Sequence, residues 1–237
     1  MVFDSETFFK GSLMNFTEYS AILSAFKEGV FTSILDSYDD ICHSQDQLIA
    51  ELTSKGAVIK GWKVVEDSGV FILSPIFDFQ IFQNQGAQLP KDKLSGIEVE
   101  ICYQCSVPLL ASDIEYAVSH SQPLVAIEVL RPKINDKSYQ SCDFYYNYGI
   151  LVSSQPIAGD FSLKSGQTYD YSTSAPDFFE QKKAVLLKGV QECVRRGYID
   201  DFFFMTGSLN GLIATDSCLG KNEVIASNGT LISVDVV

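Results

Sequence analysis

The chain has 237 residues, 46% of them hydrophobic and 20% charged, a composition typical of folded globular proteins and not of disordered or low-complexity ones. Thirty acidic residues against 17 basic ones give a formal net charge of −13 at pH 7. Because such a charge repels phosphate backbones and anionic lipid head groups, we expect neither nucleic acid nor a membrane surface as a partner.

Two further features bear on the cellular compartment. No stretch of the sequence approaches the roughly 18 apolar residues that cross a bilayer, and the first residues lack the basic and apolar blocks of a signal peptide. The six cysteines are spread through a chain that is long enough to fold without disulfides. We therefore expect a cytoplasmic protein with reduced thiols.

The first sixty residues have a helical pattern. Apolar residues between Tyr19 and Phe26 recur at helical spacing and predict one helix. Ser44 and Gln47 form a capping-box pattern that predicts the start of a second helix, which ends near Ser54. Residues 1–60 are thus predicted to form an N-terminal helical region that packs on the rest of the protein.

From Gly61 onward, runs rich in β-branched and aromatic residues predict strands. These runs are residues 61–65, 69–82, 97–105, 123–132 and 148–154, then the segment after Asp201 and a hairpin with its turn at Asn228–Gly229. The polar segments 83–96 and 166–174 are predicted as loops, and a helix is predicted from Pro176 to Arg196. The predicted fold class is α+β, with a β-rich core over 61–237 and one structural domain overall.

Three glutamates stand inside otherwise apolar strands. The side chains of Glu98 and Glu100 share one face of their strand, roughly 7 Å apart. Glu128 lies in the apolar run 123–132, where an ionised carboxylate costs several kcal/mol unless a cation compensates it. Three carboxylates suit Mg²⁺, Mn²⁺ or Ca²⁺. Equally open is the alternative that Glu98 and Glu100 face solvent on an edge strand while Glu128 pairs with a lysine or an arginine.

Four further residues are candidates for chemistry. Lys63, among apolar neighbours, can have a lowered pKa and move protons, or else it is a surface lysine whose stem lies along apolar residues. Asp78 can orient that lysine or relay a proton, or else it accepts backbone hydrogen bonds at a turn. Thr206 and Ser208 follow a predicted strand, where they can hold a carboxylate or simply form a turn.

The order and spacing of these segments resemble the fumarylacetoacetate hydrolase superfamily, and within it the branch of 2-keto-4-pentenoate hydratase and 4-oxalocrotonate decarboxylase. GWKV around Lys63 is similar to the branch's Gly-aromatic-Lys-Ile/Val strand, and IFD ends at Asp78, twenty residues before Glu98, as the branch's aspartate does. IEVEI is similar to its metal-binding ExE motif. AIEVLRPKI, which contains Glu128, resembles its LEVVDSRI segment, and FFFMTGSLNG resembles its strand that ends in TGS or TGA.

This resemblance implies a β-rich roll of mixed sheets, like the C-terminal domain of fumarylacetoacetase, that forms homodimers or larger assemblies. It assigns Glu98, Glu100 and Glu128 to Mg²⁺ or Mn²⁺, Lys63 and Asp78 to catalysis, and Thr206 and Ser208 to substrate binding. The implied activity is that of a lyase, a metal-dependent hydratase of a short 2-hydroxy-dienoate or 2-oxo-enoate. Decarboxylation of a 2-oxo acid and hydrolysis of an acylpyruvate need the same stabilised enolate, so both stay open.

The sequence also departs from the branch. The DNASSG stretch is replaced by FYYNYG at 144–149, and the Leu-Gly-His-Pro helix start is replaced by SAPDFFEQ at 174–181. These segments belong to the lid and to the substrate contacts in the branch. The competing hypothesis is therefore a catalytically impaired homologue that binds a small oxo-acid or a protein partner.

Overall fold

A computed structural model describes residues 18–22, 38–67, 70–82, 85–105, 113–132, 144, 147–157, 159–166, 169–173, 176–200, 202–226 and 229–237. Its named helices are α2 (Tyr38–Ser54), α3 (Ile114–His120) and α5 (Pro176–Arg195). Its strands are β1 (Ile59–Asp67), β2 (Val70–Phe77), β3 (Gln85–Leu89), β4 (Gly96–Cys105), β5 (Gln122–Leu130), β6 (Asn147–Val152), β7 (Phe161–Ser165), β8 (Tyr169–Thr173), β9 (Phe202–Ser208), β10 (Ile213–Ala214), β11 (Gly220–Ala226) and β12 (Gly229–Val236).

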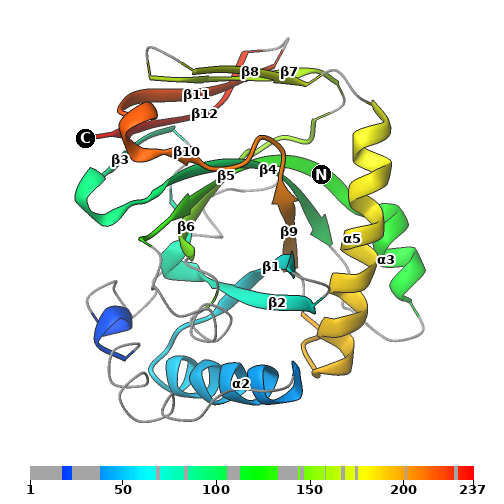
Figure 1. Cartoon of the computed structure of the whole chain (residues 1–237). Helices are drawn as coiled ribbons and strands as arrows, with labels where there is room; N and C mark the ends of the chain where they lie inside the picture. The colour runs from blue at the N-terminus through cyan, green and yellow to red at the C-terminus, as the bar shows by residue number, and fades with distance from the viewer. Residues whose placement is uncertain are drawn as a thin grey trace.

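The strands form two sheets in the described part of the chain (Figure 1). The larger has the order β2-β1-β9-β4-β5-β6, with β10 paired to β4, and the smaller has the order β3-β12-β11-β7-β8. Within the larger sheet β1 and β9 are parallel, and the other neighbours are antiparallel. Strand β4 is therefore interior, which excludes the alternative that Glu98 and Glu100 lie on an edge strand.

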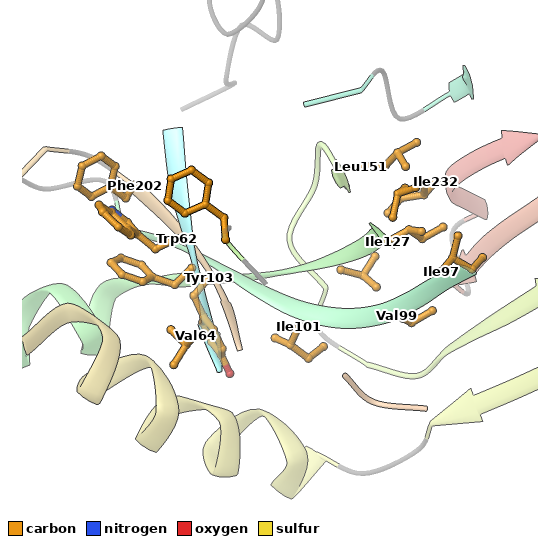
Figure 2. Packing of buried hydrophobic residues seen from close by; sticks show 14 of the residues in the cluster. Trp62, Val64, Ile97, Val99, Ile101, Tyr103, Ile127, Leu151, Phe202 and Ile232 are labelled. Atoms are coloured by element: carbon orange, nitrogen blue, oxygen red, sulfur yellow. The ribbon is translucent and has the colours of Figure 1, made fainter. Parts of the chain in front are cut away.

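Alternation along β4 gives the strand one apolar face. Ile97, Val99, Ile101 and Tyr103 point into the main hydrophobic cluster, where Ile232 of the smaller sheet also packs (Figure 2). Helix α5 runs beside this cluster, and α2 lies on the far side of β2 in Figure 1. Because the period of a strand is two, the residues between these four point to the opposite face of the sheet.

The opposite face carries a second, smaller apolar cluster. It includes Cys102 of β4, Leu124 and Ala126 of β5, and Met205 of β9. In the β4–β5 register Cys102 lies opposite Leu124. The next residues along these strands on the same face are the glutamates, so the small cluster forms the apolar floor beside them.

The predicted α+β fold class is confirmed, and three local predictions are wrong. Helix α2 starts six residues before Ser44, so the capping-box pattern lies inside the helix and Ser44 is buried there. The predicted loops contain β3 and β8, the outermost strands of the smaller sheet. Edge strands carry polar residues that discourage pairing with other chains, and this polar composition is the one that predicts a loop.

The predicted N-terminal helical region, residues 1–60, is only partly covered by the described residues. Residues 18–22 are helical, and Phe26 lies outside the described residues. Leu48 and Leu52 of α2 share the main cluster with Trp62 of β1, but the division of the chain at residue 60 stays a prediction. None of the helices in the described ranges is long and apolar enough to cross a membrane.

Close approach of β1 to β9 requires a glycine at position 61. Gly61 pairs with Phe203, and an added Cβ would lie 2.6 Å from the Phe203 carbonyl oxygen. We expect Gly61→Ala to lower the free energy of unfolding by about 1–3 kcal/mol, measured by urea denaturation. At the exposed Gly159 a Cβ meets nothing within 4 Å, so Gly159→Ala should change it by less than about 0.5 kcal/mol. Equal losses in both variants would contradict this account.

Candidate active site

Three glutamates converge on the face of the larger sheet that lies opposite the main hydrophobic cluster. Glu98 and Glu100 of β4 and Glu128 of β5 each offer one carboxylate oxygen, and these atoms lie within 4.8 Å of one another. Glu98 and Glu128 are direct partners in the antiparallel register. Like charges in that relation destabilise a sheet, so this arrangement calls for positive charge between the strands.

The donor set fits a divalent metal ion. Glu100 and Glu128 are fully buried, and Glu98 is partly buried. Among the described residues, Glu100 Oε1 and Glu128 Oε2 have no hydrogen-bond partner. A buried carboxylate oxygen without a partner is costly, whereas such oxygens are the donors that Mg²⁺, Mn²⁺ and Ca²⁺ prefer.

Lys63 of β1 supplies one positive charge to this cluster. Its Nζ donates a hydrogen bond to Glu128 Oε1 at 2.6 Å, and both side chains are buried. Glu128 thus does pair with a lysine, as one alternative had it, but the pair lies among the other two glutamates. Burial acts to lower the pKa of Lys63, yet the charges of Glu128, Glu100 and Glu98 outweigh it and raise the pKa. The predicted lowering is therefore wrong for this environment.

Burial acts to raise the pKa of a carboxyl group, whereas it acts to lower the pKa of a lysine. Burial and the neighbouring charge of Glu128 raise the pKa of Glu100 well above its ordinary value, although Lys63 acts to lower it. One hydrogen bond favours the charged form, since the Gly207 N–H donates to Glu100 Oε2 at 3.0 Å. Without further positive charge, the cluster thus favours a proton on Glu100.

The structure does not bring Asp78 to Lys63. Asp78 begins a short 3-10 helix (Asp78–Gln80) after β2, and its Oδ1 accepts a hydrogen bond from the Val58 N–H at 3.1 Å. Val58 and Lys63 are five residues apart, roughly 16 Å along an extended chain. The prediction that Asp78 orients Lys63 is thus wrong, and Asp78 has the alternative role of accepting a backbone hydrogen bond at a turn.

Thr206 and Ser208 lie at the site, at the end of β9. The Thr206 hydroxyl donates to the Ile101 carbonyl at 2.8 Å, so its hydrogen is already engaged by the backbone. The Ser208 hydroxyl accepts from the Gly211 N–H at 2.9 Å, which leaves its hydrogen able to donate to a ligand. Of the two predicted carboxylate contacts, Ser208 is therefore the better placed donor.

A pocket of about 460 Å³ opens onto these groups. Lys63, Glu98, Glu100 and Ser208 line it, and so does Lys182 of α5, which sequence reasoning missed. In the sequence, Lys182 is one of several lysines in a predicted surface helix, and no motif separates it from its neighbours. Only the packing of α5 against β9 reveals its position.

No protein-family model matches the sequence, and no curated protein matches it significantly. Solved structures match its fold. The 4-oxalocrotonate decarboxylase from Pseudomonas putida G7, complexed with calcium and acetate, matches with a TM-score of 0.71 at 12% identity, over 96% of this chain and 100% of that chain. The same enzyme complexed with magnesium and adipate gives 0.72 at the same identity and coverage. The protein Cg1458 matches with a TM-score of 0.52 at 10% identity, over 77% of each chain.

At these identities the comparisons establish the fold and leave the activity open. The chain has the fold of 4-oxalocrotonate decarboxylase, over nearly the whole length of both proteins. The predicted roll is confirmed, and the fold is the one that the sequence resemblance implies.

The raised pKa of Glu100 predicts how stability depends on pH after divalent ions are removed with EDTA. Between its ordinary value near 4.5 and its raised value, the folded protein keeps a proton that the unfolded chain has released. Stability should therefore fall as pH rises through this window. Glu100→Gln cannot ionise, so we expect its free energy of unfolding, relative to the wild type, to increase from pH 4.5 upward in urea titrations.

The matched control for this experiment is Glu51→Gln. Glu51 lies on α2 with about half of its side chain exposed, and its pair with Lys55 is an ordinary surface contact. This variant should follow the pH profile of the wild type. A difference between Glu100→Gln and wild type that stays constant from pH 4.5 to 8 would show that Glu100 does not titrate abnormally.

Proposed function

We propose that this protein is a divalent-metal-dependent hydratase of a short 2-hydroxy-dienoate or its 2-oxo tautomer. Glu98, Glu100 and Glu128 would hold Mg²⁺ or Mn²⁺. The observation that carries the proposal is the convergence of three carboxylates, two of them with an unpartnered buried oxygen, beside Lys63 in a pocket. The decarboxylase of the same fold has been crystallised with a divalent ion and a carboxylic acid, which supports a ligand of this class.

A bound divalent ion supplies Lewis-acid stabilisation of the negative charge on the oxygen of a 2-oxo acid. The hydrogen bond from Lys63 Nζ to Glu128 Oε1 at 2.6 Å holds an ammonium group at the site, so its first role is that of a proton donor. As the dienol loses its hydroxyl proton to solvent, Lys63 Nζ would donate a proton to the carbon skeleton to give the 2-oxo form. The neutral amine, held by Glu128, can then take a proton from the water whose oxygen adds to the substrate, and return it to the carbon beside the 2-oxo group. Solvent then restores the proton on Lys63.

Other groups at the pocket would seat the substrate. The Ser208 hydroxyl can donate to the substrate carboxylate, in the role that sequence analysis gave it. Val185 of α5 and Leu212 contribute apolar lining, which suits the hydrocarbon part of a short dienoate. Contact with such side chains excludes water and strengthens the electrostatic interactions inside the pocket.

Decarboxylation of a 2-oxo acid is a second candidate, which the fold match to 4-oxalocrotonate decarboxylase favours. Product analysis separates the two reactions, because hydration consumes a dienoate without release of CO₂. The cytoplasmic location and the homodimer or larger assembly stay predictions from the sequence.

The metal assignment predicts the effect of Glu128→Gln. Calorimetric titration of the wild type with Mn²⁺ should show binding. Loss of a group that only orients a metal ligand lowers metal affinity roughly 10–100-fold, so loss of the ligand itself in Glu128→Gln should lower the affinity for Mn²⁺ by more than that. Metal-dependent turnover of 2-hydroxy-dienoates should disappear in the variant and in wild type treated with EDTA, while Glu51→Gln stays active. Absence of Mn²⁺ binding by the wild type would refute the proposal, and binding without turnover of any dienoate or 2-oxo acid would favour the impaired homologue.

The role of Lys63 predicts a selective effect on kcat. Lys63→Arg keeps a positive charge beside Glu128 but cannot release a proton at neutral pH. We expect kcat to fall by about 10²–10⁴ while Mn²⁺ affinity stays close to that of the wild type. Lys55→Arg, at an exposed position on α2, is the control and should leave both unchanged. Full activity of Lys63→Arg would show that Lys63 acts only as a charge.

A further inference from the structure

Lys182 joins helix α5 to the end of strand β9. Its Nζ donates hydrogen bonds to the carbonyl oxygens of Thr206 at 2.8 Å and of Gly207 at 2.9 Å. The side chain is part-buried, and burial lowers the pKa of Lys182 although the charge of Glu100 acts to raise it. Two carbonyl acceptors offset part of the cost of placing an ammonium group here.

One peptide group connects this ammonium with a metal-ligand candidate. The Thr206–Gly207 peptide accepts from Lys182 through its carbonyl and donates through its N–H to Glu100 Oε2 at 3.0 Å. The peptide group is planar and rigid, so fixing its carbonyl also fixes the direction of its N–H. A cation on the carbonyl further polarises the group and strengthens the hydrogen bond that its N–H makes.

The backbone at Gly207 permits this geometry. Gly207 has a φ of 91°, in the left-handed region that favours glycine, and its own carbonyl also reaches Lys182. An added Cβ at this position would lie 3.4 Å from Lys182 Nζ. Gly207 therefore both adopts the backbone conformation that this turn requires and accepts a hydrogen bond from Lys182.

We propose that Lys182 is a positioning residue of the metal site. It holds the Thr206–Gly207 peptide so that the N–H fixes Oε2 of Glu100, which leaves Oε1 for a metal ion. Groups that orient a metal ligand in this way contribute to metal affinity without touching the ion. The part of the inference that concerns metal affinity rests on the proposed function, whereas the link from Lys182 to Glu100 is independent of it.

The link can be tested on the protein without added metal. Thr206–Gly207 is the only Thr-Gly pair in the sequence, so labelling with [1-¹³C]threonine and [¹⁵N]glycine gives one amide signal, that of Gly207, in an HNCO spectrum. We expect this proton to move upfield in Lys182→Met, because its hydrogen bond to Glu100 weakens. Lys183→Met is the matched control, since Lys183 pairs with Glu180 on the surface and should leave the signal in place.

Metal affinity provides the second measurement. In Mn²⁺ titrations, Lys182→Met should bind roughly 10–100-fold more weakly than the wild type, Lys182→Arg should recover part of the loss, and Lys183→Met should bind normally. A lower melting temperature of Lys182→Met with an unmoved Gly207 signal and normal Mn²⁺ affinity would overturn the proposal, because it would reveal a purely structural role.

Two other outcomes need a separate interpretation. If Lys182→Met does not fold, Glu100→Gln tests the same link from its other end, with a shift of the Gly207 signal expected and an unmoved signal overturning the proposal. If the wild type binds no Mn²⁺, the proposed function and the metal-positioning role both fail, and the Gly207 signal then decides only whether Lys182 and Glu100 are linked.

Discussion

Compensation of buried negative charge is the constraint on which this site depends. Three glutamates meet at a site where two of them are fully buried, and Lys63 pairs with Glu128. If all three are ionised, their negative charge exceeds what the paired Lys63 balances, and a divalent ion would reduce this excess. Without such an ion the cluster can relieve the repulsion by protonating Glu100, in keeping with its raised pKa. A hydrophobic core would gain nothing from this arrangement, so its cost points to a role in binding or chemistry.

The larger sheet brings these groups together by register. Alternation places Glu98 and Glu100 on the face away from the main core, and the antiparallel pairing sets Glu128 opposite Glu98. Strand β9, between β1 and β4, adds the Gly207 N–H on one side of Glu100 and aligns Met205 with Lys63. Helix α5 contacts the same end of β9, where Lys182 donates a hydrogen bond to the Thr206 carbonyl. Strands β1, β4, β5 and β9 and helix α5 thus all contribute groups to a single polar cluster.

The sequence was sufficient where local periodicity decides the structure. Glu98 and Glu100 share a face because a strand has period two, and this holds whatever the partner strands are. The pairing of Lys63 with Glu128 spans 65 positions and depends on which strands become neighbours, which periodicity does not encode. Asp78 was misjudged because β2 ends at Phe77 and the chain turns away there. Lys182 was missed because a helical lysine looks the same in sequence whether it faces solvent or a strand end.

The position of β9 has a consequence for how the protein folds. This strand follows more than 130 residues after β1, yet it lies directly between β1 and β4 and pairs with both. The centre of the larger sheet therefore closes only through contacts of long sequence separation, which are slow to form. We therefore expect the polar cluster to be assembled late, after the local pairs β1–β2 and β4–β5 have formed.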